Sequence, residues 1–87
     1  MTLKIEKTAN GKWVLFTLSG RIEAQHIAEL RTLLAFRAVG RSVVLDLREI
    51  RLVDREAVRF LAKCDLDGVK LQNCPAYIAE WIAKEEI

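Results

Sequence analysis

Four arginines within a short stretch are the residues of this sequence best suited to recognise an anion: Arg48, Arg51, Arg55 and Arg59. A guanidinium group donates paired hydrogen bonds to a carboxylate or a phosphate, so this cluster could bind an acidic protein surface or a phosphorylated ligand. Arg55 and Arg59 would share one face of a helix, where Glu56 can form an ion pair with Arg59. The alternative is a solvated helix face whose charges neutralise one another.

The other residues that could do acid–base chemistry favour structural roles. Asp46 and Asp54 could act as paired carboxylates. However, Asp46 lies at the end of an apolar run, and Asp54 stands where a helix N-cap would accept the backbone N–H of Glu56 or Ala57. His26 is the only histidine, and we expect it to face solvent in the first turn of a helix. A single imidazole supplies neither a metal pair nor an acid–base dyad.

Cysteines and glycines provide no catalytic motif either. Cys64 and Cys74 form no CxxC pair, and we expect both to be reduced and partly buried. Lys63 is the only basic sequence neighbour that would lower the pKa of Cys64, which disfavours a nucleophile. The glycines are isolated turn or cap residues and form no phosphate-binding loop. We therefore expect a protein that is not an enzyme and that uses no cofactor and no metal.

We expect one small domain that is cytoplasmic. The chain has 87 residues, of which 52% are hydrophobic, and we place a single domain over residues 1–87. A formal net charge of +2 is too small to favour nucleic acid or an anionic membrane surface as a partner. No apolar run approaches the ~18 residues of a membrane span. The first residues do not resemble a signal peptide.

The first part of the chain predicts a β-hairpin. Residues 3–7 alternate apolar and polar side chains, as in a half-buried strand. Asn10-Gly11 is a strong hairpin signal, because both residue types tolerate a positive φ. Residues 13–18 are almost all apolar, which is typical of a strand covered on both faces. We expect Ser19-Gly20 to end this strand.

A helix and a central strand follow. Glu23 and Ala24 open the helix, and Gly40 is expected to end it. Residues 43–47 form an apolar run typical of a strand buried on both faces. Because a right-handed helical crossover would join it to the previous strand, the two strands should be parallel. Arg48 and Arg51 are then expected in the loop that leads to the next helix.

The remaining sequence predicts a second helix, an edge strand and a third helix. Asp54 caps the second helix, Asp67-Gly68 ends it, and residues 69–72 alternate as in an edge strand. Pro75 precedes the last helix. The apolar residues on the two helices are Ala57, Val58, Leu61 and Ala62, then Ile78, Trp81 and Ile82. We expect the aromatic face of the last helix to belong to the core; the alternative is an exposed docking surface.

These elements predict an α/β domain with a four-stranded mixed sheet and about three helices packed on it, because the helices can bury their apolar faces only against the sheet. Particular segments then point to a family. Residues 20–23 follow a strand, residues 43–47 are the apolar run, residues 52–54 lead into a helix, and residues 73–75 follow the edge strand. Their order and spacing resemble those of STAS domains of bacterial anti-sigma-factor antagonists, in a short and divergent form.

The resemblance implies a regulatory role without the usual switch. In these antagonists a Ser or Thr after the matching Asp is phosphorylated by a kinase that is also the anti-sigma factor, and the added negative charge prevents binding. Asp54 fits the motif, but Arg55 occupies the acceptor position and carries no hydroxyl. The resemblance therefore implies a protein that is not controlled by phosphorylation at this position.

We expect a non-catalytic bacterial signalling domain that binds another protein. The candidate docking residues are Arg51, Asp54, Arg55, Glu56 and Arg59. The partner implied by the resemblance is an anti-sigma factor or a histidine-kinase-like ATPase. Two alternatives stay open: a small-molecule or phospho-ligand sensor that uses the same arginines, and a self-associating module such as a homodimer formed through an exposed sheet edge.

Overall fold

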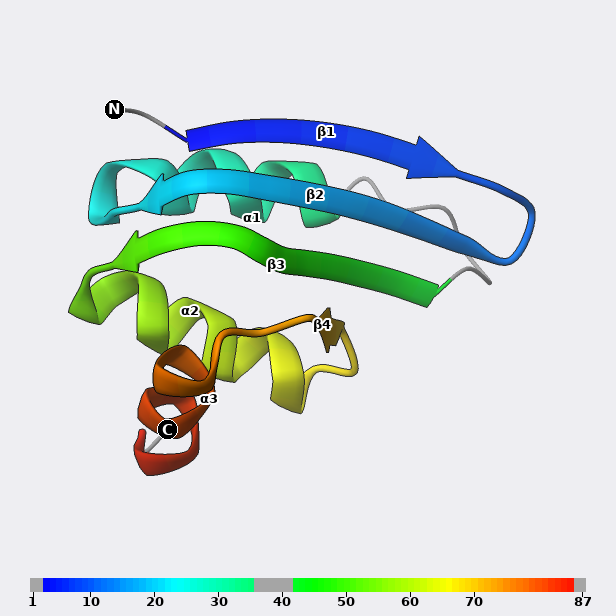
Figure 1. Ribbon diagram of the computed structural model, residues 1–87. Coiled ribbons are helices and arrows are strands. Elements are labelled where there is room, and N and C mark those ends of the chain that lie inside the picture. The colour runs from blue at the N-terminus through cyan, green and yellow to red at the C-terminus, as the bar shows by residue number, and fades with distance from the viewer. Residues whose placement is uncertain (1–2, 36–41, 86–87) are drawn as a thin grey trace.

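The strands form a single mixed sheet. The computed structural model describes residues 3–35 and 42–85 and contains four strands in the order β1-β2-β3-β4 (Figure 1). β1 (Leu3–Ala9) pairs antiparallel with β2 (Trp13–Ile22), and β2 pairs parallel with β3 (Ser42–Val53). The short edge strand β4 (Lys70–Gln72) pairs parallel with β3. The predicted four-stranded mixed sheet is confirmed.

The helices connect the parallel strands. A short 3-10 helix, η1 (Ala24–His26), and α1 (Ile27–Ala35) follow β2; α2 (Arg55–Leu66) joins β3 to β4; and α3 (Ala76–Lys84) follows β4. Both crossovers step in the same direction across the sheet, so right-handed connections place α1 and α2 on the same face. Gly40, which was expected to end the first helix, lies outside the described residues.

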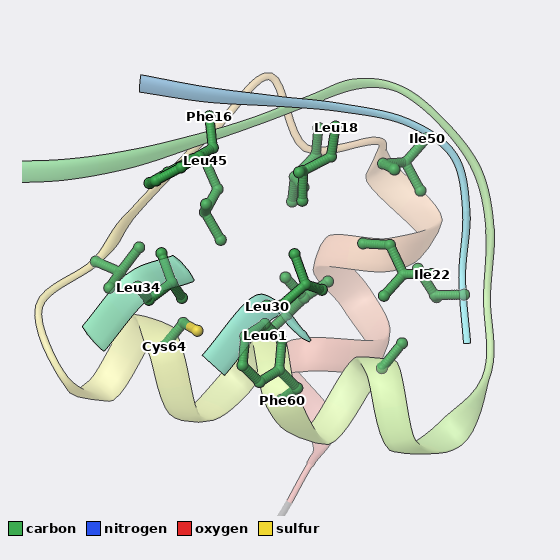
Figure 2. Close-up of a cluster of buried hydrophobic side chains, with 14 of the residues drawn as sticks. Phe16, Leu18, Ile22, Leu30, Leu34, Leu45, Ile50, Phe60, Leu61 and Cys64 are labelled. Atoms are coloured by element: carbon green, nitrogen blue, oxygen red, sulfur yellow. The ribbon is translucent and has the colours of Figure 1, made fainter. Parts of the chain in front are cut away.

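The core lies between that face and the helices. Figure 2 shows side chains of β2 and β3, such as Phe16 and Leu45, pointing toward Leu30 of α1 and Leu61 of α2. The alternate side chains of the same strands, including Leu15, are only partly buried. The expectation that β2 and β3 are covered on both faces is therefore wrong. Within the described residues, α1 and α2 pack on the same face of the sheet.

Two irregularities lengthen β3 relative to β2. Between the Thr17–Asp46 and Ser19–Glu49 pairs, and again between the Gly20–Ile50 and Arg21–Leu52 pairs, β3 contains one residue more than β2. An extra residue bulges out and turns the following side chains to the other side. The buried residues of this half of β3 therefore recur at every third position: Leu47, Ile50 and Val53.

The bulges also correct two expectations about this region. Ser19-Gly20 does not end β2, because Gly20 adopts a φ of 97°, which glycine tolerates, and the strand continues to Ile22. Arg48 and Arg51, expected in a loop, lie at exposed positions of the bulged strand. β2 thus reaches the turn that precedes α1, and β3 reaches the start of α2.

Candidate functional site

Asp54 determines how α2 begins. Its Oδ1 accepts the backbone N–H of Ala57 at 2.9 Å, which confirms the predicted N-cap. Its Oδ2 accepts the backbone N–H of Ala24, in the first turn after β2, at 2.8 Å. Its own N–H donates to the carbonyl oxygen of Ile22 at 3.2 Å. One half-buried residue therefore joins the starts of two helices at the carboxyl ends of β2 and β3, on the left in Figure 1.

His26 belongs to the same junction. Its Nδ1 accepts the backbone N–H of Glu23 at 3.0 Å, and the side chain is half-buried. The expected solvent-facing position is wrong, because the imidazole folds back to cap the turn that precedes α1. Since Nδ1 is an acceptor in this bond, the ring serves a structural role here.

The candidate docking residues surround this junction. Arg51 on β3 and Arg55, Glu56 and Arg59 in the first turns of α2 are all exposed. Arg59 pairs with Glu85, whose Oε1 lies 3.4 Å from Nε, instead of with Glu56. Within residues 3–35 and 42–85, the side chains of Arg51 and Arg55 make neither a hydrogen bond nor an ion pair.

α3 packs against α2 and also reaches β3 through Tyr77. The Oη–H of Tyr77 donates to the carbonyl oxygen of Arg51 at 2.7 Å. The Tyr77 ring meets the Trp81 ring edge to face, with centroids 5.4 Å apart. Ile78 is fully buried, whereas Tyr77 and Trp81 are 41% and 45% exposed. The expectation that Trp81 belongs to the core is wrong, because Ile78 takes the position that faces the core.

A groove lies between the start of α2 and α3. Its volume is about 430 Å³, and it is lined by Val53, Asp54, Arg55, Val58, Trp81, Lys84 and Glu85. Val53 and Val58 are buried core residues, so they supply an apolar lining. The groove was not predicted, since its residues come from β3, α2 and α3, and only their packing brings them together.

The remaining reactive residue types have structural partners or are buried. Oδ1 of Asp46 accepts the backbone N–H of Arg48 at 3.0 Å and Nδ2 of Asn73 at 3.3 Å. Burial raises the pKa of the Cys64 thiol to about 11, and burial also raises the pKa of Cys74. No three His, Cys, Asp or Glu side chains of the described ranges gather as a metal-binding group. No helix in these ranges has the length and hydropathy to cross a bilayer.

Comparison with known proteins identifies the fold. No protein-family model matches the sequence, and no curated protein matches it significantly. The structure is similar to that of an antisigma-factor antagonist, a STAS domain from Rhodobacter sphaeroides. The TM-score is 0.67 at 15% sequence identity, covering 82% of this chain and 86% of that chain.

Two further solved structures are similar. A protein of the DUF3478 family from Shewanella loihica PV-4, described as having a SpoIIAA-like fold, matches with a TM-score of 0.56 at 16% identity, covering 75% of this chain and 56% of that one. A protein named Mglu matches with a TM-score of 0.57 at 28% identity, covering 77% of this chain but 18% of Mglu. The predicted STAS-like fold is confirmed.

Proposed function

We propose that this chain, a divergent domain with the STAS fold, is a non-catalytic regulatory domain that binds another protein at the start of α2. The docking surface consists of Arg51, Asp54, Arg55, Glu56 and Arg59. The observation that carries the proposal is the Asp54 junction, whose bonds at 2.8 and 2.9 Å hold the first turn of α2 and leave Arg55 exposed directly after it. A preorganised surface loses less conformational entropy when a partner binds.

The proposed partner is an anti-sigma factor or a histidine-kinase-like ATPase in the bacterial cytoplasm. Support comes from the similarity to a structure described as an antisigma-factor antagonist. A second support is the position of the exposed arginines. They lie at the start of α2, which the sequence resemblance marks as the switch site. Arginine is also among the residue types that contribute most binding energy in protein interfaces.

The docking surface carries the permanent positive charge of Arg55 at the position where phosphorylation could add a negative charge. Arg55 has a guanidinium where a phosphorylated hydroxyl would add negative charge. We therefore propose that binding at this surface does not respond to phosphorylation at the start of α2, and that the surface attracts acidic partners at all times.

A non-catalytic role is supported by how the reactive side chains are used. The carboxylates of Asp46 and Asp54 and the imidazole of His26 accept hydrogen bonds from backbone N–H groups. The raised pKa of the buried Cys64 keeps its thiol protonated at neutral pH, which disfavours nucleophilic attack.

The proposal is tested by quantitative capture of partners from native cells with the tagged wild-type chain, Arg55→Gln and Arg59→Gln. Lys63→Gln, on the other end of α2, is the matched control. We expect a kinase-like or anti-sigma partner to be recovered with wild type and the control and to be depleted by roughly tenfold with Arg55→Gln, as for removal of an interface arginine. Equal recovery with all variants would exclude this surface.

A further inference from the structure

We propose that the groove between α2 and α3 binds an acidic segment of the partner protein, which inserts an apolar side chain beside Trp81 and places a carboxylate against Arg55. The inference rests on the proposed function and names the chemistry of the partner at that site. It also extends the docking surface from α2 onto α3.

The apolar half of the groove is built from two buried valines and one exposed indole. Val53 and Val58 are 4% and 5% exposed, whereas Trp81 is 45% exposed. The edge-to-face contact with Tyr77, at a centroid distance of 5.4 Å, orients the indole. Tyr77 is itself held by the hydrogen bond from its hydroxyl to the backbone carbonyl of Arg51. An oriented, exposed tryptophan beside an apolar lining is suited to cover an inserted side chain.

The charged half of the groove holds two carboxylates, Asp54 and Glu85, and two cations, Arg55 and Lys84. Asp54 accepts two backbone N–H groups, Lys84 Nζ lies 3.0 Å from Glu80 Oε1, and Glu85 pairs with Arg59 at 3.4 Å. Among the charged lining residues, only Arg55 has no ion pair or hydrogen bond to another described residue.

A carboxylate on the partner would balance this charge and can accept two hydrogen bonds from the guanidinium. Arg51, whose backbone carbonyl accepts the Tyr77 hydroxyl, has no ion pair to a described residue, but it does not line the groove. Because Arg55 has no ion pair with a described residue, its guanidinium favours a partner that presents a carboxylate at this point.

The shape of the groove favours a peptide segment over a metabolite. Sites for small molecules usually enclose roughly 70–90% of the ligand surface. Here Trp81 and the exposed Arg55 leave one side of the groove, of about 430 Å³, accessible to solvent. A partner side chain can enter from this side while its backbone stays on the surface.

Selection of random dodecapeptides on the whole chain tests the inference. We expect the recovered peptides to combine Asp or Glu with a nearby Leu, Phe or Trp. Arg55→Gln and Trp81→Ala should each weaken their binding about tenfold or more. Lys63→Gln and Leu66→Ala, which change a cation and an exposed apolar residue at the other end of α2, should have no effect. A second selection on Arg55→Glu should recover basic peptides.

The inference is wrong if no peptide is recovered, if the peptides lack acidic residues, or if Trp81→Ala and Arg55→Gln bind them as wild type does. Binding that requires a phosphorylated residue would also contradict it. A native partner that depends on Arg55 but not on Trp81 would exclude the groove and leave the proposed function intact. Acidic peptides that bind in the groove, without any native partner that depends on Arg55, would support the inference about the groove and contradict the proposed function.

Discussion

Asp54 directly after β3 and Ala24 after β2 are 30 positions apart in the sequence, yet the Asp54 carboxylate accepts the backbone N–H of Ala24 at 2.8 Å. The same carboxylate caps α2 through Ala57 at 2.9 Å. The proposed docking surface therefore depends on a bond between two chain segments, and the position of Arg55 follows from it.

Replacing Asp54 by Ala should destabilise the fold. The variant loses a helix cap and the bond to Ala24, so we expect the free energy of unfolding to fall by about 1–3 kcal/mol in urea denaturation. Asp54→Asn keeps one carbonyl acceptor and should lose less. The control Asp65→Ala, at an exposed position of the same helix, should change stability by less than about 0.5 kcal/mol. Equal losses in Asp54→Ala and the control would contradict the role of the junction.

The hydroxyl of Tyr77 should contribute to holding α3 on β3. Tyr77→Phe removes only the 2.7 Å bond to the Arg51 carbonyl and keeps the aromatic contact with Trp81. We expect a loss of about 0.5–1.5 kcal/mol in the free energy of unfolding. Faster amide hydrogen exchange in α3 should accompany it. Unchanged stability together with unchanged exchange would show that packing alone holds α3.

Gly68 and Gly11 should respond differently to replacement by Ala. Both positions have open space for a Cβ, but only Gly68 has a positive φ, of 92°. Gly68→Ala should therefore cost about 1–2 kcal/mol, and Gly68→Asn should cost less. Gly11→Ala should change stability by less than about 0.5 kcal/mol, because the turn is held by Asn10 Oδ1, which accepts from the N–H groups of Lys12 and Trp13 at 2.8 and 2.9 Å. Equal thermal shifts for the two Ala variants would refute this distinction.

Stability should fall at alkaline pH because of Cys64. Burial, with a smaller effect of Asp67, raises the pKa of this thiol from 9.0 to about 11. The folded chain keeps the proton where the unfolded chain loses it, so the contribution is fully present below pH 9.0 and is lost as the pH rises toward about 11.

The loss attributable to Cys64 should reach on the order of 2–3 kcal/mol. Urea denaturation from neutral pH to about pH 10 measures the start of this decline. Cys64→Ala should show a shallower decline than wild type, whereas Cys74→Ala should keep most of it. The same slope in wild type and Cys64→Ala would assign the effect to other groups.

The patterns that depend on neighbouring residues were predicted well. Alternation identified β1, the apolar run identified β3, and Asp54 was recognised as the N-cap of α2 because the cap bond reaches only to Ala57. The resemblance of these segments to STAS domains implied the STAS-like fold, which the structural similarity confirms. That a partner protein binds at Arg55 stays a prediction.

The sequence by itself determined the elements, their order and the exposed cations at the start of α2, because periodicity, capping and charge are properties of short segments. Tertiary structure decided three things that involve distant residues. It bonded Asp54 to Ala24, paired Arg59 with Glu85 instead of Glu56, and left Trp81 exposed while Ile78 entered the core. Tertiary structure also decided the bulges in β3, because the register of a strand is defined only relative to its partner strand. Each of these features depends on how β2, β3, α2 and α3 pack together. The residues in contact are far apart in the sequence, so a local sequence pattern cannot predict them.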